Sequence, residues 1–420
     1  MDAFSFLSSL DMATLMLLFW YTTLLEIPRY TIGALIAPPV ALWMSRHHPG
    51  HHHFTLSIVL VGHNEEKPLR TCVESLGEQT VNDLHERPQI VVVDDGSTDA
   101  MSQVANALQR EGRIDHALRL EQRGGKSAGV NLALSICTGD IVVISDIDTT
   151  FDRNALAELV DYFSDPAVGA VSGNLGVRNV SASLMTRFQA IEYMIGLSLG
   201  RTVADALGTL SIVSGAFGAF RRSAIDSVGG QDVEVGEDAD LTMKLRRAGW
   251  RLRFAPEAVA LTDVPETVSA FIAQRLRWDR GLITVWARKY RALLDPRYST
   301  FRIADAAAVF DVVFFQILLA AAFPVYVVWL GYYFGAFAIT ILGATLAGYV
   351  VLDGLVFASA ATIGMRTPLW LIAYLPLYTV LQTLLVRPVR LVAIVQELIF
   401  RSSYRDPYVP RHVMTQVEVV

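Results

Sequence analysis

The chain has 420 residues, of which 52% are hydrophobic and only 18% are charged. Soluble proteins carry about 25% charged residues, and because the shortfall here is local, the composition predicts membrane segments beside a domain of ordinary composition. The net charge of −6, with no basic domain, argues against a nucleic-acid partner.

The first apolar stretch, 12–44, is interrupted by charged residues and a proline. One kinked membrane crossing is the preferred interpretation, and a tight two-helix hairpin is the alternative. No signal-peptide pattern is present. Residues 1–28 lack Lys and Arg whereas Arg46 follows the stretch, so the positive-inside rule places the N-terminus outside and the next domain in the cytoplasm. We assign residues 1–50 to an N-terminal membrane segment and linker.

The histidine run and the two cysteines do not predict a metal site or a disulfide framework. The run HHPGHHH (47–53) could bind a metal, but a solvated linker is favoured because no cysteine or carboxylate cluster completes a site. The two cysteines, Cys72 and Cys137, lack metal-ligand spacing. A disulfide framework is not expected, which suits a cytosolic domain.

Residues 54–265 have the pattern of an α/β domain. Three Val/Ile-rich runs, 54–66, 88–99 and 141–150, end in polar or acidic residues and alternate with helical spacing. This alternation predicts a parallel sheet with right-handed crossovers, in which a ligand lies beyond the carboxyl ends of the strands. We therefore expect the acidic strand ends to converge on one crevice. The buried stripe of the first helix is expected to be Leu69, Cys72, Val73 and Leu76.

A pair of acids follows the third expected strand. Asp146 and Asp148 flank Ile147, and on an extended chain their carboxylates point the same way. Two hard oxygen ligands suit Mg²⁺ or Mn²⁺, which take substrate phosphates as further ligands. Taken alone, such a pair is far more often part of a surface turn.

The other candidate residues also have plain structural interpretations. Asp94 and Asp95 begin DDGSTD, which fits a turn and helix cap, and Lys126 in RGGKSAG fits a solvated lysine. Glu237 and Asp238 fit the favourable position of acids at a helix start.

A small-residue loop, SGAFGAFRRSA, contains Ser214 and Gly215 and precedes the helix that is expected to start at GED. Leu241 and Leu245 form the expected buried stripe of that helix, and Gly249 is expected to end it.

QRLRW (274–278) lies in a region, 266–303, that we expect to form interfacial amphipathic helices. Arginines crowd around Trp278. The plain interpretation is a helix at the membrane surface with snorkelling arginines. The functional interpretation is that this helix presents its polar side to an active site above it.

Transmembrane helices are expected in 304–387. Three apolar segments, 308–332, 335–361 and 368–386, are each long enough to span about 30 Å of hydrocarbon. The remainder, 388–420, begins with a stretch too short to cross back and is expected to be an interfacial helix and tail. Three crossings would leave the tail outside, whereas its arginines favour the cytoplasm, so its side stays open.

Strand-end acids, then DxD, then GED, then QRLRW, in this order, resemble the processive glycosyltransferases of glycosyltransferase family 2. That family includes hyaluronan, cellulose, chitin and poly-N-acetylglucosamine synthases. The resemblance covers about residues 54–300, and SGNLGVRN (172–179) and FQAIEY (188–193) are similar to stretches of the poly-N-acetylglucosamine and hyaluronan branch. It implies a cytoplasmic, parallel-sheet nucleotide-sugar-binding domain of the glycosyltransferase A type beside α-helical transmembrane segments.

One departure from the family concerns the first strand. It usually ends in Pro-Ala-Tyr-Asn-Glu or a similar sequence, whereas here it ends in VGHNE (61–65). The grip on the nucleotide base is therefore expected to differ. His63 is a candidate substitute contact, and a loop histidine with no role is the alternative.

On the donor side, the resemblance implies that Asp94 and Asp95 contact the uracil and ribose of a UDP-sugar and that Lys126 helps to hold the nucleotide. Asp146 and Asp148 would hold Mg²⁺ or Mn²⁺ at the diphosphate. The residues implied to bind the nucleotide sugar are Asp94, Asp95, Lys126, Asp146, Gln274 and Arg277.

On the acceptor side, the resemblance implies that Asp238 is the general base for the attacking hydroxyl, a role worth about 10²–10⁴-fold in rate. A flat indole suits the apolar face of a pyranose. The residues implied to bind the acceptor are Trp278, Glu237, Ser214 and Gly215.

We therefore expect an inverting enzyme of the cell membrane that polymerises a UDP-sugar into a β-linked polysaccharide and exports it, with several crossings and a cytoplasmic catalytic domain. Its expected partners are the UDP-sugar donor, the growing glycan and the lipid bilayer; a second copy or an accessory export protein is an open alternative. The transfer of one sugar to a lipid is the rival function. A non-catalytic transport or assembly scaffold is the third.

Overall fold

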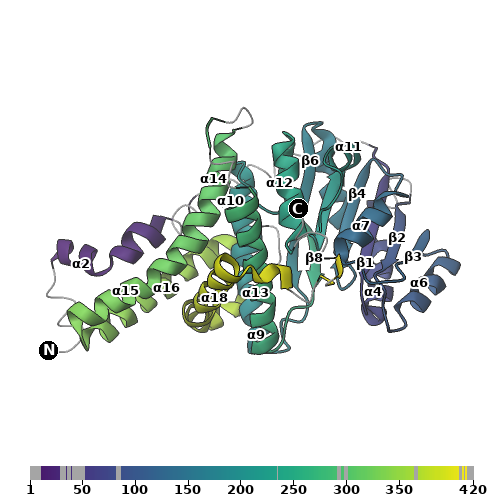
Figure 1. Ribbon diagram of the computed structural model, residues 1–420. Coiled ribbons are helices and arrows are strands. Elements are labelled where there is room, and N and C mark those ends of the chain that lie inside the picture. Colours follow the sequence, from purple (N-terminus) through teal and green to yellow (C-terminus); the bar gives the residue numbers. More distant parts are fainter. Residues whose placement is uncertain are drawn as a thin grey trace.

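A computed structural model gives the structure of the protein. It describes residues 11–28, 35, 39, 53–81, 87–233, 235–290, 295–297, 301–363, 368–405, 409–410 and 412–413. A sheet domain covered by helices occupies one side of the molecule, and long helices extend from it to the other side (Figure 1).

One eight-stranded sheet forms the centre of the domain, in the order β3-β2-β1-β4-β7-β6-β8-β5. The three predicted strands are present as β1 (Leu56–Gly62), β2 (Gln89–Asp94) and β4 (Ile141–Asp146), and β1 pairs in parallel with both of the others. β3 (His116–Arg119), which the sequence pattern did not indicate, pairs in parallel with β2. The predicted α/β domain with a parallel sheet is confirmed in this half.

The other half of the sheet is mixed. β7 (Phe217–Arg221) runs antiparallel to β4 and to β6 (Val168–Val177), β6 runs parallel to β8 (Arg251–Thr262), and β5 (Thr150–Phe151) pairs antiparallel with β8. A short apolar run carries no information on strand direction, which explains why the sequence did not predict this half. Because β7 runs against β4, the loop before β7 lies at the edge where β4 ends.

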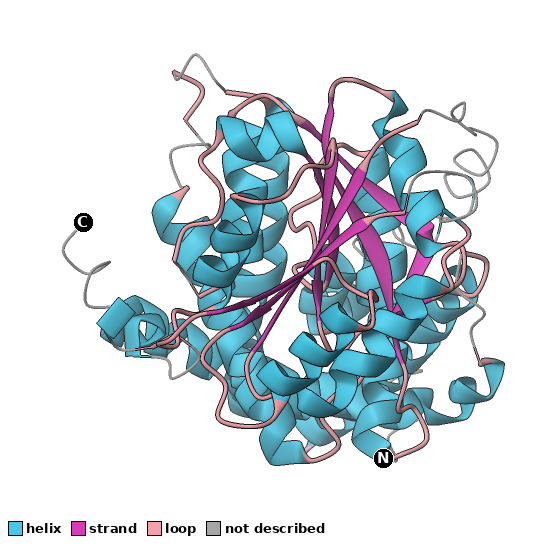
Figure 2. Cartoon of the chain, turned by 90° about the vertical axis from the view of Figure 1, so that its right-hand side faces the viewer, coloured by secondary structure: helices cyan, strands magenta, loops and turns pink. Residues whose placement is uncertain are grey.

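Helices cover both faces of the sheet (Figure 2). One face packs against α4 (Glu66–Gly77), α6 (Met101–Arg110) and α8 (Ala155–Val160). The other face packs against α7 (Lys126–Leu134), α11 (Arg222–Ser227) and α12 (Glu237–Arg247). Along β1, Ile58 and Leu60 enter the first core, whereas Val59 and Val61 enter the second. Burial on both faces explains the unbroken apolar runs.

Two predicted helix stripes are confirmed. In α4, the buried residues are Leu69, Cys72, Val73 and Leu76. In α12, Leu241 and Leu245 are fully buried. Gly249 follows that helix with φ of +91°, a conformation that glycine adopts without strain, so it ends the helix as predicted.

Three helical runs are long and apolar enough to cross a membrane: Ile303–Phe334, Phe337–Ala360 and Leu369–Phe400. The first includes α14 (Ile303–Asp311) and α15 (Leu319–Phe334), and the second is α16. These two runs agree with the predicted segments 308–332 and 335–361. α15 and α16 extend together away from the sheet domain in Figure 1.

The third run has no break at residue 387, where the sequence suggested a change from a membrane segment to an interfacial helix. α17 (Leu375–Leu381) continues through a wider helical turn, Gln382–Val386, into α18 (Arg387–Phe400). Pro388 therefore does not end the helix. It follows a turn in which the regular hydrogen-bond spacing has already changed.

The described part of the N-terminal segment packs on these runs. α2 (Met12–Leu18) and the turn Tyr21–Glu26 share an apolar cluster with α15 and α16. Glu26, one of the residues that interrupt the apolar stretch, is buried and forms an ion pair of 2.7 Å with Arg387. Most of 29–52 lies outside the described residues, including the choice between one crossing and a hairpin and the histidine run before residue 53.

Candidate active site

Asp94 ends β2 and is almost fully buried. Its carboxylate accepts hydrogen bonds from the Ser97 amide (2.8 Å) and the Ser102 hydroxyl, and the Arg119 guanidinium lies 3.9 Å away. Burial opposes ionisation, but the hydrogen bonds from Ser102 and Ser97 outweigh it and lower the pKa of Asp94 below its ordinary value. Asp94 is thus a fixed anion at the strand end, and its contact with a nucleotide base stays a prediction.

Asp95 fixes the glycine-rich turn. Its carboxylate accepts hydrogen bonds from the amides of Gly124 (2.6 Å) and Gly125 (2.9 Å). Gly125 has φ of +83°, which favours glycine. Lys126 begins α7 directly after this turn, so Asp95 sets the position from which Lys126 extends.

Lys126 connects two of the predicted motifs. Its ammonium forms an ion pair with the Asp146 carboxylate at the end of β4 and donates a hydrogen bond to the Gly215 carbonyl at 3.0 Å. Asp148 lies in the turn two residues beyond Asp146. Burial and the charge of Asp146 raise the pKa of Asp148 to about 6. The metal-binding role of this DxD pair stays a prediction.

Arg178 holds the turn that carries Asp148. Its guanidinium donates hydrogen bonds to the Asp148 carbonyl at 2.9 Å and to the Asp263 carboxylate at 2.8 Å. No role for Arg178 could be predicted from the sequence, because its partners lie 30 and 85 residues away along the chain. The local feature that could have indicated a role for Arg178 is its position in SGNLGVRN (172–179), directly after β6.

The end of β1 contributes a third acid to this edge of the sheet. Burial, together with the charges of Asp148 and Asp146, raises the pKa of Glu65 to about 7. His63 lies beside it, with Nδ1 2.9 Å from the Asp95 carbonyl oxygen. The ring therefore ties the ends of β1 and β2 together, and its contact with a base stays a prediction. Glu65 is a residue of the site that the sequence interpretation left without a role.

The loop before β7 brings the acceptor-side candidates to the same edge. The Gly215 amide donates a long hydrogen bond of 3.4 Å to Asp238 Oδ2. A Cβ atom at Gly215 would lie 3.2 Å from Lys126 Nζ and 3.4 Å from Asp238 Cβ, so glycine allows this close approach. The buried Ser214 fixes the loop, since its amide donates to the Ser172 hydroxyl at 3.2 Å.

The acids at the start of α12 occupy different environments. Asp238 is half-buried, whereas Glu237 and Asp240 are buried. Burial and the charge of Asp238 raise the pKa of Glu237 to about 7. Asp240 points into the interior, where it accepts a hydrogen bond from the Tyr290 hydroxyl (3.0 Å) and pairs with Lys289 (2.6 Å). Asp238 is therefore the acid of this helix that is best placed to meet a ligand.

QRLRW lies on α13 (Val268–Ile283), which reaches the site through a close backbone contact. A Cβ atom at Gly281 would lie 2.7 Å from the Val235 carbonyl oxygen and 3.2 Å from Gly236 Cα, directly before α12. Trp278 is 38% exposed on this helix. Arg275, which sequence analysis left out of the site, is the buried arginine of the motif, and Arg277 is half-buried.

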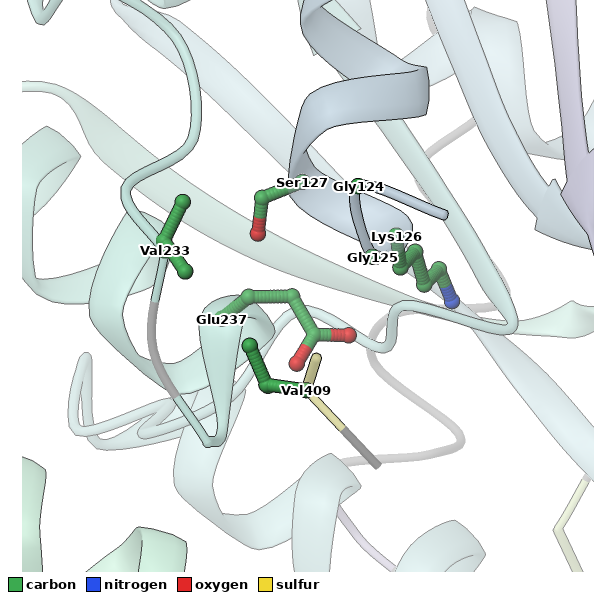
Figure 3. A pocket seen from close by; sticks show the side chains of 7 residues that line it. All are labelled: Gly124, Gly125, Lys126, Ser127, Val233, Glu237 and Val409. Atoms are coloured by element: carbon green, nitrogen blue, oxygen red, sulfur yellow. The ribbon is translucent and has the colours of Figure 1, made fainter. Parts of the chain in front are cut away.

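A small cavity lies between the glycine-rich turn and the start of α12 (Figure 3). Gly124, Gly125 and Ser127 line one side, and Glu237 lies across from them. Val409 closes the cavity, packing with Val235, and Pro410 lies near Gly125. The segment after the third helical run thus touches the turn that presents Lys126.

The acids present fit a divalent cation that shares its ligands with a substrate. Among the residues with described positions, no group of three or more His, Cys, Asp and Glu side chains is arranged to hold a metal ion. Mg²⁺ needs only one or two protein carboxylates when phosphate oxygens and water supply the rest. Burial and the charge of Asp146 raise the pKa of Asp148, and a divalent cation held by these residues would favour the charged form of both carboxylates.

The structure joins four predicted residues by direct contacts, in the order Asp146, Lys126, Gly215 and Asp238. It shows α13 beside this group, reached through Gly281. None of these contacts was visible in the sequence, because each joins residues that are far apart along the chain.

A helix-covered sheet whose strand-end acids face a small-residue loop defines a nucleotide-sugar transferase fold of the glycosyltransferase A type. Residues 57–229 match the family model described as glycosyl transferase family 2. The match identifies a glycosyl transferase family 2 domain within the chain, as the order of the motifs predicted.

Two curated relatives have the names of synthases or transferases. The chain is 31% identical over 218 residues to poly-beta-1,6-N-acetyl-D-glucosamine synthase of Staphylococcus aureus (strain COL), covering 51% of this chain and 52% of the relative. It is 29% identical over 238 residues to an N-acetylglucosaminyltransferase of Rhizobium meliloti (strain 1021), covering 54% and 55%. The chain therefore matches about half the length of these relatives.

Among solved structures, the mannosyltransferase PcManGT of Pyrobaculum calidifontis, in complex with GDP-Man and Mn²⁺, has the same fold. Its TM-score is 0.61 at 21% sequence identity, over 82% of this chain and 98% of that one. The similarity confirms the predicted fold class, with a mixed sheet in place of a wholly parallel one.

Proposed function

We propose that the protein is a membrane-embedded, inverting glycosyltransferase that polymerises a UDP-sugar into a β-linked polysaccharide and exports it. The observation that carries the proposal is the series of contacts from Asp146 through Lys126 and Gly215 to Asp238. Sugar transfer needs a cationic site for the departing diphosphate and a base beside the acceptor hydroxyl. These contacts bring both kinds of group to one edge of the sheet.

On the donor side, Asp94 and Asp95 contact the nucleoside and Lys126 faces the diphosphate. Asp146 and Asp148 would hold a divalent cation, Mg²⁺ or Mn²⁺, which would stabilise the negative charge of the leaving group. Arg178 fixes the turn that carries Asp148 through its hydrogen bond to the Asp148 carbonyl. Gln274 and Arg277 of α13 cover the pyrophosphate, since the guanidinium group suits phosphate oxygens.

On the acceptor side, an acceptor hydroxyl attacks the anomeric carbon from the face opposite the diphosphate. The new bond to the acceptor oxygen forms as the bond to the diphosphate oxygen breaks, which inverts the anomeric centre. Asp238 takes the hydroxyl proton, and UDP leaves with the electron pair. The Gly215 amide orients Asp238, while Ser214, Glu237 and Trp278 shape the acceptor site.

The proposed enzyme crosses a membrane several times and has its sheet domain in the cytoplasm. The length and apolar composition of the three helical runs support the membrane location. α13 then lies at the membrane surface, where the growing glycan passes from Trp278 towards the helical part. The name of the Staphylococcus aureus relative supports a polymer product and N-acetylglucosamine as the first donor sugar to try. A second copy of the chain or an accessory export protein is the proposed partner of these runs in a channel.

The test is to incubate membranes that contain the full chain with a panel of labelled UDP-sugars and to size the product. Release of UDP together with a labelled polymer supports the proposal. A single-sugar glycolipid would replace it with transfer to a lipid acceptor. Binding of UDP without turnover for any donor would favour a non-catalytic scaffold.

A further inference from the structure

Arg275 is the buried arginine of QRLRW, with 8% of its surface exposed. Its Nη2 atom donates a hydrogen bond of 2.6 Å to Glu192 Oε2, at the end of α9 (Leu184–Glu192). α9 packs on Phe271 of α13 through Phe188, shares an apolar cluster with α16 and α17, and also contacts β6. The ion pair therefore ties α13 to a helix that lies between the sheet and the apolar runs.

The Arg275 guanidinium also lies over two aromatic rings. Its central carbon is 4.3 Å from the ring centre of Trp278 and 4.9 Å from that of Phe271. These residues stand three positions after and four positions before Arg275, which puts all three on one face of the helix. The guanidinium therefore covers one face of the indole, while 38% of Trp278 remains exposed.

A second ion pair fixes the same face of the helix, one turn beyond Arg275. Asp279, the residue after Trp278, is buried and accepts a hydrogen bond of 3.1 Å from Arg390 of α18. Burial raises the pKa of Glu192, and the nearby charges of Arg275 and Arg390 oppose that shift. The charged groups that act on Glu192 thus come from α13 and from the third apolar run, and the two ion pairs on this face of α13 join it to separate elements.

We propose that Arg275, held by Glu192, is a positioning residue that sets the plane of the Trp278 indole on which the acceptor sugar stacks. The proposal rests on the proposed function, which gives Trp278 its acceptor. A lysine at 275 would keep the positive charge but lose the flat guanidinium that lies on the ring. A cation–π attraction holds an arginine over an indole face, and the same attraction opposes rotation of the Trp278 ring away from Arg275.

The kinetic test is a double-mutant cycle with Arg275→Lys and Trp278→Ala in the full-length protein in membranes. The acceptor is a β-1,6-linked N-acetylglucosamine pentamer. We expect Arg275→Lys to raise the acceptor KM by about 3- to 30-fold with kcat and UDP affinity little changed. In the Trp278→Ala background the same change should have no further effect, because Arg275 acts through that ring. Additive effects would overturn the proposal.

A spectroscopic test does not depend on the reaction. The emission of Trp278 is obtained as the difference between a protein and its Trp278→Phe partner, with and without Arg275→Lys. We expect the lysine variant to shift this emission to the red and to let acrylamide quench it more strongly. Glu192→Gln should act in the same direction and Glu192→Asp less so. Arg280→Lys, one turn further along α13, is the matched control and should change nothing.

An unchanged Trp278 spectrum in both the Arg275 and Glu192 variants would show that the ring is held without them and would overturn the proposal. If the wild-type protein fails to extend the pentamer while the spectrum changes as expected, the positioning of Trp278 stands and the acceptor assignment fails. The two failures are therefore distinguishable.

Discussion

At the scale of single residues, Asp238 and Asp240 stand two positions apart on one helix but have different surroundings. Asp238 is half-buried beside the Gly215 amide, and Asp240 is buried against Lys289 and Tyr290. Both acids belong to the first turn of α12, and their different neighbours leave only Asp238 accessible to a ligand. The GED motif alone does not make that distinction.

Asp238→Asn keeps the shape of the side chain and removes its ability to accept a proton. We expect kcat to fall by about 100-fold or more while UDP affinity stays close to wild type. Asp240→Asn is the matched control: it should lower the melting temperature because it weakens the contacts with Lys289 and Tyr290, and it should keep most of kcat. Loss of UDP affinity in Asp238→Asn with normal turnover would show that Asp238 is a binding residue.

Glu237 links stability to pH. A carboxyl group whose folded-state pKa is raised favours the folded state when protonated, so the cost of ionising Glu237 appears as the pH rises from about 4.5 to about 7. Glu237→Gln removes this cost, which is about 1.4 kcal/mol for each unit of pKa difference. We expect the variant to melt above wild type at about pH 8, with the gap closing as the pH falls. A gap that does not depend on pH would contradict this account.

The metal prediction concerns Asp148, which Asp146 and Arg178 flank. Asp148→Asn should reduce sugar transfer by about 100-fold or more, and excess chelator should do the same to wild type until Mg²⁺ or Mn²⁺ is restored. Asp152→Asn, an exposed acid four residues further along the chain, is the matched control. Full activity in excess chelator would remove the cation from the proposed mechanism.

At the scale of secondary-structure elements, local patterns predicted what local forces decide. The three parallel strands, the buried stripe of α4 and the glycine that ends α12 all follow from the period of apolar residues or from backbone conformation. The antiparallel β7 and the short β3 could not be predicted in this way. Their direction and pairing depend on neighbours far away in the chain.

The same division applies to the site. The acids at the strand ends were predicted because parallel strands bring their carboxyl ends together. The roles of Arg178 and Arg275 were not, because a hydrogen bond to Asp148 and an ion pair with Glu192 each cross from one element to another. Glu65 lies in the first predicted strand run, 54–66, but its raised pKa comes from burial and from the charges of Asp148 and Asp146, which lie far along the chain.

The contact between α13 and the start of α12 joins two glycines, Gly281 of α13 and Gly236 directly before α12. A methyl group at position 281 would lie 2.7 Å from the Val235 carbonyl oxygen, which is fixed backbone. We expect Gly281→Ala to push QRLRW away from Asp238, lowering acceptor-dependent transfer by about tenfold or more, since small misplacements are costly in catalysis. Gly196→Ala, in a helix with open space around it, is the control and should be neutral. Equal activities of the two variants would show that the contact is dispensable.

At the scale of the whole molecule, charged groups join the third apolar run to the N-terminal segment and to α13. Arg387 pairs with Glu26 of the N-terminal segment, and its guanidinium lies 4.9 Å from the ring centre of Phe323. Arg390, one helical turn later, pairs with Asp279 of α13. The third apolar run therefore contacts both the first described segment of the chain and the helix that carries QRLRW.

Removing one partner of the buried Glu26–Arg387 pair should destabilise the apolar part, because an uncompensated buried charge costs about 3–5 kcal/mol. We expect Glu26→Gln to lower the melting temperature of the detergent-purified protein. The double variant Glu26→Gln with Arg387→Gln should recover much of the loss, since no lone charge remains. Equal melting temperatures for wild type and Glu26→Gln would show that the charge is hydrated in place.

The contact of Val409 and Pro410 with the glycine-rich turn sets an order of events during synthesis. Chains emerge from the ribosome with the N-terminal end first, and domains fold as they appear. The turn around Gly125 is made early, but the side chains that close the small cavity beside it are made after all three apolar runs. In a ribosome-bound chain the glycine-rich turn thus lacks the contact with Val409 and Pro410 until the three apolar runs have been translated, so this part of the cavity is completed last.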